Sequence, residues 1–175
     1  DRSSASFRSS TLAEFEPHQR ARVAAFMPGG PYAKLLAERQ VILQIGENVF
    51  AHGGVLPEHV AYGIDEINSS AQAWLRGEAE LPSVLSGSNS PQWTRLYSDD
   101  PDSAACSVLE EALNALQAKR IVVGHTIQES GIASACGRQA WRVDIGMAEY
   151  YATRTEYGGS VAVLEIIGDS VRVLN

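Results

Sequence analysis

Two histidines stand where apolar stretches of the chain end. His52 follows NVFA and precedes Gly53 and Gly54, and His125 follows RIVVG. Such runs, rich in β-branched residues, are typical of buried strands. Because loops at strand ends converge on one crevice in α/β proteins, we expect the two imidazoles to lie together. Neutral imidazole is a ligand of zinc, iron and manganese, so the pair favours a shared metal site over two histidines that only cap turns.

Length and charge limit the class of protein. The 175 residues suit one domain with a sizeable core. The net charge of -7 argues against broad binding to nucleic acid or to an anionic membrane, because both favour basic patches. No apolar run is long enough to span a bilayer and no signal peptide is visible. Cys106 and Cys136 have no metal-type spacing and are expected to be buried free thiols. We therefore expect a cytoplasmic protein.

The elements that must position the histidines alternate between strand and helix patterns. VILQIG and NVFAHG, separated by a tight turn at residues 46–48, predict a hairpin. A second hairpin is predicted at the C-terminus, where Gly168 and Asp169 separate two strand-forming runs. AWRVDIGM predicts another strand, and the Ser-, Gly-, Asn- and Pro-rich residues 81–92 predict a loop. Helical patterns cover residues 11–26, with a break or start at Pro17, and residues 31–40, 57–78 and 102–119. The chain is therefore an α/β or α+β domain.

Four segments, in a particular order, resemble one family. FAHGG at Phe50 to Gly54 and GHT at Gly124 to Thr126 resemble the calcineurin-like metallophosphoesterases. PQWTRLYS at residues 91–98 and WRVDIGM at residues 141–147 narrow the resemblance to the bacterial-type, Shewanella-like branch of the phosphoprotein phosphatases. The resemblance runs from about Val41 to the end, after a helical lead-in over residues 1–40. It implies the calcineurin-like four-layer α/β/β/α sandwich.

Three further blocks of the family pattern do not occur in this sequence: Asp-x-His, Gly-Asp-x-x-Asp-Arg-Gly and Gly-Asn-His-Glu. In the family these blocks supply the ligands of a first metal, an asparagine of the second, one phosphate-binding arginine and a histidine acid. The resemblance therefore implies the C-terminal half of the fold, with a complementary N-terminal segment as its partner. This chain alone is expected to bind at most one metal ion weakly and to be inactive.

The resemblance also implies roles for individual residues. The intact family site holds two divalent metal ions, which are manganese, iron or zinc, and hydrolyses phosphate esters without a phosphoenzyme. In that scheme His52 and His125 ligate the second metal. Arg95 contacts the phosphate, for which a guanidinium fork is well shaped. The alternative for Arg95 is a surface ion pair with Asp99 or Asp100.

Other residues near these motifs have two possible roles each. Asp144 either orients a ligand histidine or stabilises a turn, and Gly53 and Gly54 either allow close backbone approach or form a plain turn. Trp93 and Tyr97 either line the cleft or pack in the core. His18 and His59 are expected to be solvated surface residues. Trp141 and Met147 are expected to lie in the core.

The expected substrate is a phosphoprotein monoester, of the serine/threonine type, or a small phosphate ester. Nucleic acid and membrane are not expected as partners. Two alternatives remain open from the sequence. A diadenosine tetraphosphatase-like hydrolase would share the histidine motifs, and a non-catalytic remnant that binds a partner would explain the missing blocks.

Overall fold

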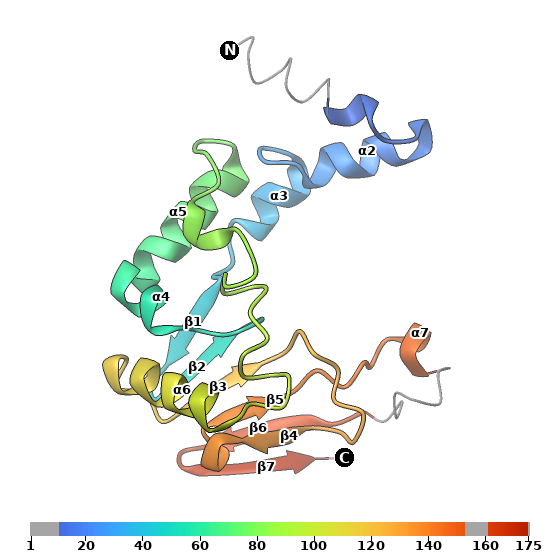
Figure 1. Cartoon of the computed structure of the whole chain (residues 1–175). Helices are drawn as coiled ribbons and strands as arrows, with labels where there is room; N and C mark the ends of the chain where they lie inside the picture. Colours follow the sequence, from blue (N-terminus) through green and yellow to red (C-terminus); the bar gives the residue numbers. More distant parts are fainter. Residues whose placement is uncertain (1–10, 153–160, 175) are drawn as a thin grey trace. The chain divides into compact units, whose positions relative to one another are not determined.

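The computed structural model describes residues 11–152 and 161–174 (Figure 1). The chain divides into two compact units. The first unit contains the chain up to Gln40 together with Asn68–Pro82. The second unit contains Val41–Ile67 and the chain from Ser83 onward. Every residue with an expected chemical role lies in the second unit.

Short helices make up the described part of the first unit. Helices α2 (Pro17–Phe26) and α3 (Pro31–Leu36) each begin with proline, which costs no hydrogen bond in the first helical turn. The expected helix start at Pro17 is therefore confirmed. Gly30, between the two helices, must be glycine because a Cβ atom there would lie 2.4 Å from the carbonyl oxygen of Ala24.

A five-stranded mixed sheet forms the centre of the second unit, with the order β1-β2-β3-β5-β4. Strands β1 (Ile42–Ile45) and β2 (Asn48–Ala51) form the expected hairpin, with Asn48 already in the strand. Strand β2 pairs in parallel with β3 (Arg120–Val123), and β3 in parallel with β5 (Ala140–Arg142). A strand that was not predicted, β4 (Ala133–Ala135), pairs antiparallel with β5. Strands β2, β3 and β5 therefore end at one edge of the sheet.

The second unit also contains helices. Helix α6 (Ser103–Ala115) is capped by Asp102, whose carboxylate accepts a hydrogen bond of 2.8 Å from the Ala105 amide. One face of α6 is buried, with Ala105, Leu109, Ala112 and Leu113 in the core, and α6 packs against α4 (Pro57–Tyr62). The single helix expected over residues 57–78 is interrupted at Gly63, whose φ of +103° separates α4 from α5 (Ile64–Arg76). The short elements are η1 (Ser83–Leu85), η2 (Cys136–Arg138) and α7 (Glu149–Ala152).

The C-terminal hairpin is confirmed. Strands β6 (Val163–Ile167) and β7 (Ser170–Leu174) pair antiparallel in a two-stranded sheet of their own, around a turn at Gly168 and Asp169. The mixture of parallel and antiparallel strands with helices confirms an α/β fold. The four-layer sandwich stays a prediction.

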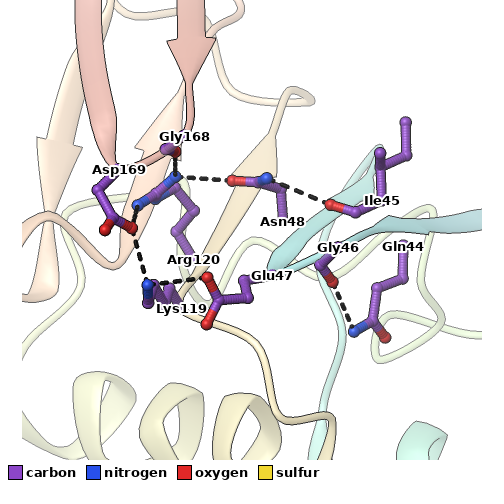
Figure 2. A network of polar contacts seen from close by, with 9 residues as sticks. All are labelled: Gln44, Ile45, Gly46, Glu47, Asn48, Lys119, Arg120, Gly168 and Asp169. Carbon is purple, nitrogen blue, oxygen red and sulfur yellow. Dashed lines mark hydrogen bonds and ion pairs between the residues drawn. The ribbon is translucent and has the colours of Figure 1, made fainter.

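A polar network joins the C-terminal hairpin, β6–β7, to the start of strands β2 and β3 (Figure 2). Arg120, at the start of β3, has a side chain that is only 9% exposed and donates a hydrogen bond of 2.8 Å to Oδ1 of Asn48 on β2. The neighbouring Lys119 ammonium lies 2.8 Å from the carboxylate of Glu47 and 2.7 Å from that of Asp169. The network therefore connects the β1–β2 turn, the start of β3 and the β6–β7 turn.

The expectation of two free thiols is wrong. Cys106 on α6 and Cys136 in η2 form a disulfide between positions 30 residues apart. The turn after β4 lies beside α6, and the spacing of the cysteines in the sequence does not reveal this. Because disulfides persist mainly in oxidising compartments, the free-thiol argument for a cytoplasmic location no longer holds. No helix in the described ranges is both long and apolar enough to cross a membrane.

Of the two side chains predicted to lie in the core, one is buried and the other is exposed. Trp141 is 5% exposed and belongs to the core, as predicted. Met147 is 58% exposed, so its predicted core position is wrong. Met147 follows the end of β5, and the extended pattern that suggested a longer strand does not continue there.

Candidate functional site

His52 and His125 meet at the C-terminal edge of the sheet. His52 directly follows β2, and His125 follows β3 after Gly124, whose amide donates a hydrogen bond of 2.9 Å to the carbonyl of His52. Nε2 of His52 lies 3.1 Å from Nδ1 of His125. The rings meet edge to face, with centroids 4.9 Å apart. The juxtaposition expected from the strand ends is therefore present.

His125 has a constrained environment. Its φ of +66° is in the left-handed region, and the ring lies edge-on to the indole of Trp93 at 5.3 Å. Burial lowers the pKa of His125, and the nearby Arg95 and His52 lower it further. Nε2 is buried and makes no hydrogen bond of standard geometry in the described chain, although the Trp93 backbone is close enough to raise the pKa. The environment therefore favours the neutral imidazole, which is the form that ligates metals.

Arg95 reaches the same edge. One guanidinium nitrogen, Nη1, donates to the carbonyl of His125 at 2.9 Å and to Oγ1 of Thr126 at 2.8 Å. In the described part of the chain Arg95 has no ion pair with an acidic residue, and Asp100 pairs instead with Arg142 at 3.1 Å. The alternative of a surface ion pair for Arg95 is therefore not what the structure shows.

Gly53 and Gly54 allow the segment that carries Arg95 to pack closely. Their amides donate to the carbonyl of Pro91 at 2.8 and 3.1 Å. A Cβ atom on Gly53 would lie 2.7 Å from the carbonyl oxygen of Thr94, and one on Gly54 would lie 3.0 Å from the ring of Tyr97. The close backbone approach in this structure is therefore between two parts of the chain, and approach by a substrate stays a prediction.

A cavity of about 920 Å³ opens beside these residues. Gly87, Ser88 and Asn89 of the loop predicted at residues 81–92 form part of the wall of this cavity. Trp93 is 61% exposed and lines the cavity, whereas Tyr97 is fully buried in the core and donates to the carbonyl of Val55 at 3.1 Å. The volume suits a small-molecule or peptide side-chain site. The lining residues are Leu56, Gly87, Ser88, Asn89, Trp93, Thr94, Arg95, Leu96 and His125.

His59 is buried, so the expectation of a solvated side chain is wrong. It is 1% exposed, and Nδ1 accepts a hydrogen bond of 3.0 Å from the amide of Leu56. Burial lowers the pKa of His59, against opposing effects from Glu58 and from a hydrogen-bonded contact with the backbone of Asn89. Both Leu56 and Asn89 line the cavity. His59 therefore contacts two residues that line the cavity. It is the third residue of α4, from which an acceptor side chain can bond to the amide of the residue before the helix, and this position was the signal in the sequence that could have indicated the contact. His18 is exposed, as expected.

Asp144 stabilises a turn. Its Oδ1 accepts a hydrogen bond of 3.1 Å from the amide of Gly146. Its charge also favours the protonated form of His125. Within residues 11–152 and 161–174, however, no hydrogen bond joins Asp144 to either histidine. The structure therefore supports the turn role, and the orienting role stays a prediction.

The two histidines fit as part of a metal site. Two nitrogen ligands at about 2.0–2.1 Å from a tetrahedral ion lie roughly 3.3 Å apart. The separation of 3.1 Å between Nε2 of His52 and Nδ1 of His125 is close to that value. The described residues contain no group of three or more His, Cys, Asp or Glu side chains that could hold a metal. The pair therefore supplies two suitable ligands, and the described chain does not complete the set.

Comparison with known proteins confirms the resemblance to the Shewanella-like branch. Shewanella-like protein phosphatase 2 of Arabidopsis thaliana is 40% identical over 162 residues, which cover 89% of this chain and 40% of that protein. An uncharacterised protein of Acanthamoeba polyphaga mimivirus is 29% identical, over 85% of this chain and 72% of its own length. No protein family model matches the chain.

Solved structures show the same relationship at the level of the fold. The cold-active protein-tyrosine phosphatase of a psychrophilic Shewanella species superposes with a TM-score of 0.61 and 23% identity, over 79% of this chain and 41% of that chain. A second structure of a cold-active protein tyrosine phosphatase gives a TM-score of 0.59 and 24% identity, over 84% and 46%. The matched region is the C-terminal half of that phosphatase. The chain thus spans less than half of the Arabidopsis and Shewanella proteins.

Proposed function

We propose that this chain is the C-terminal half of a protein phosphatase that hydrolyses phosphate monoesters. The observation that carries the proposal is the meeting of His52, His125 and Arg95 at one sheet edge, beside a cavity of about 920 Å³. The names of the similar proteins support phosphatase chemistry. The metal requirement rests on the type of donor in the histidine pair and on the resemblance.

The chain's own residues have distinct tasks in this proposal. Arg95 uses Nη1 for the His125 carbonyl and for Thr126, which leaves Nε and Nη2 to donate to phosphoryl oxygens. His52 and His125, when neutral, would hold one divalent ion, which would supply Lewis-acid chemistry at the phosphoryl group. The resemblance implies that the acid for the leaving group and the remaining ligands come from a segment that carries the three blocks absent from this sequence.

We propose a phosphoprotein as the substrate, with the phosphorylated side chain in the cavity. The serine/threonine type expected from the motifs competes with tyrosine, which the names of the cold-active phosphatase structures supply. Trp93 favours tyrosine, because an indole that is 61% exposed on the cavity wall can pack against an aryl ester.

The test is phosphate release by the full-length protein that contains this chain, in the presence of Mn²⁺. One peptide is offered with phosphoserine, phosphothreonine or phosphotyrosine at the same position, and diadenosine tetraphosphate is offered separately. We expect hydrolysis of a phosphopeptide, reduced about 100-fold or more by His52→Ala or by Arg95→Gln. The control is His18→Ala, an exposed histidine of the first unit, which should retain full activity.

Two results would contradict the proposal. Preferential cleavage of diadenosine tetraphosphate would favour the nucleotide hydrolase. A folded full-length protein that releases no phosphate from any substrate, with each of Mn²⁺, Zn²⁺ and Fe²⁺, would favour the non-catalytic remnant.

A further inference from the structure

Arg95 is held along one side of its guanidinium group. Both hydrogens of Nη1 are used, by the His125 carbonyl at 2.9 Å and by Oγ1 of Thr126 at 2.8 Å. In the described chain, Nε and Nη2 have no partner. These two atoms present parallel N–H groups, the geometry that binds two oxygens of a phosphoryl group at once. The direction of this free edge therefore depends on what holds Nη1.

Thr126 is itself fixed by hydrogen bonds. Its Oγ1 lies 2.8 Å from Oγ of Ser98, whose residue is 1% exposed. The side-chain amide of Gln128 donates to the Ser98 carbonyl at 3.0 Å and to the Thr126 carbonyl at 2.8 Å. One amide group therefore bridges the two backbone positions whose hydroxyl groups meet. The Thr126 hydroxyl cannot move away from Arg95 without breaking these contacts.

The two segments involved are also anchored through their backbones. The amide of Ser98 donates to the carbonyl of Arg95 at 3.1 Å, so Ser98 lies one turn after the arginine. The amide of Gln128 donates to the carbonyl of Asp144 at 2.7 Å, which ties the loop after β3 to the chain after β5. We call the chain of hydrogen bonds from Gln128 and Ser98 through Thr126 to Arg95 the relay. The relay thus starts from fixed backbone on both sides and ends at the guanidinium group.

We propose that Thr126 is a positioning residue for Arg95, and that Ser98 and Gln128 hold it in place. The relay aims the Nε and Nη2 edge of Arg95 at the position of a bound phosphoryl group. The anion in this statement rests on the proposed function, whereas the control of the arginine's orientation does not. Valine has the shape of threonine but lacks the acceptor oxygen, so Thr126→Val leaves Nη1 with a single acceptor.

The first measurement follows the guanidinium group directly, in the full-length protein labelled with ¹⁵N-arginine. In the wild type we expect separate, slowly exchanging Nη1 and Nη2 signals for Arg95, identified by their loss in Arg95→Lys. Thr126→Val should average these signals, and Thr126→Ser, which keeps the hydroxyl, should restore them. The control is Ser130→Ala, which removes an exposed hydroxyl from the same loop and should leave the signals unchanged.

The second measurement is binding of inorganic phosphate and of orthovanadate by calorimetry, together with steady-state kinetics on a phosphopeptide. Thr126→Val should weaken anion binding and raise KM by about tenfold, as expected from losing one hydrogen bond to a charged group. The change in kcat should be smaller, because the contact holds the phosphoryl group before and during the reaction. Thr126→Ser should return both values to within about twofold of the wild type.

The outcomes separate this proposal from the proposed function. If the Arg95 signals are averaged in Thr126→Val but the wild type binds no phosphate, the relay is retained and its role in phosphoryl binding is overturned. Unchanged Arg95 signals and unchanged phosphate affinity in folded Thr126→Val would overturn the relay. If Thr126→Val does not fold, Ser98→Ala replaces it: this variant removes only the support of Thr126, and equal signals and affinity in Ser98→Ala and wild type would likewise overturn the relay.

Discussion

Nε2 of His52 lies 3.1 Å from Nδ1 of His125, although 73 positions separate the two residues in the sequence. The contact follows from the pairing of β2 with β3, because both parallel strands end at the same edge. In the proposed metal site, the same two nitrogens that form this hydrogen bond would be the ligands. Metal binding must therefore replace the hydrogen bond, since a nitrogen that carries a proton has no lone pair for a metal.

The 175-residue chain alone should bind Mn²⁺ weakly and should hydrolyse p-nitrophenyl phosphate little or not at all. Two neutral imidazoles bring no negative charge, and catalytic sites normally offer at least three protein ligands. Calorimetry should show that His52→Ala or His125→Ala removes the weak binding, whereas His18→Ala leaves it intact. Robust turnover that the double variant His52→Ala, His125→Ala abolishes would mean that this chain already holds a complete site.

Gly53→Ala should destabilise the protein by about 1–3 kcal/mol, as overpacking does in cores. The added methyl group would lie 2.7 Å from the Thr94 carbonyl oxygen and 3.0 Å from the Gln92 carbonyl carbon, and backbone atoms cannot rotate away. Urea unfolding measures the change. The matched control is Gly124→Ala, whose new methyl group would find its nearest neighbour at 3.6 Å. Equal stability of the two variants would contradict the close packing of the chain at Gly53.

Cys106→Ser should lower the free energy of unfolding by roughly 3–4 kcal/mol, the loop-closure value for a bridge that spans 30 residues. Reductant should produce a similar loss in the wild type and should have no further effect on the variant. The measurement is urea unfolding with and without dithiothreitol. A wild-type unfolding midpoint that does not respond to reductant would show that the two thiols are not bonded in solution.

Stability should fall as the pH falls below about 6.5 through the titration of His59. Burial lowers the pKa of folded His59 below the ordinary value of 6.5, so the unfolded chain takes up the proton first. The stabilisation is therefore complete above pH 6.5 and is lost as the pH falls through the folded-state pKa. Protonation also removes the Nδ1 lone pair that accepts the Leu56 amide.

The measurement for His59 is the urea midpoint between pH 7.5 and 5. His125, whose pKa is also lowered, contributes with the same sign, so the effect of His59 is the difference between wild type and His59→Gln. We expect a flatter pH dependence in His59→Gln than in the wild type. A wild-type and a His59→Gln curve of equal slope would show that His59 does not titrate differently in the folded and unfolded chain.

The sequence predicted those elements whose position is set by a few neighbouring residues. The two hairpins follow from glycine-containing turns between strand-forming runs, and the start of α2 follows from Pro17. The meeting of His52 and His125 was predictable because strand ends in an α/β fold share one edge. The direction of Arg95 came from its position in a familiar motif rather than from any property of its neighbours.

The misplaced residues depend on distant contacts. His59 lies among polar residues in the sequence, and only the packing of α4 shows that its ring faces inward. The disulfide requires α6 to lie beside the turn after β4, and β4 itself is three small residues without a strand pattern. The hydroxyl groups of Ser98 and Thr126 carry no sequence signal for their contact, since 28 residues separate them.

The polar network around Arg120 lies at the start of the two strands whose other ends carry the histidines (Figure 2). A slip of β2 against β3 that preserved the inward and outward faces would move by two residues, or about 6.6 Å. Such a slip would separate His52 from His125 and would break the bond between Arg120 and Asn48. The contact between Arg120 and Asn48, at the opposite ends of the same strands, therefore helps to fix the strand register on which the histidine pair depends. A substitution at Arg120 or Asn48 that allowed such a slip would then separate His52 from His125 although no residue at the histidine end of the sheet had changed.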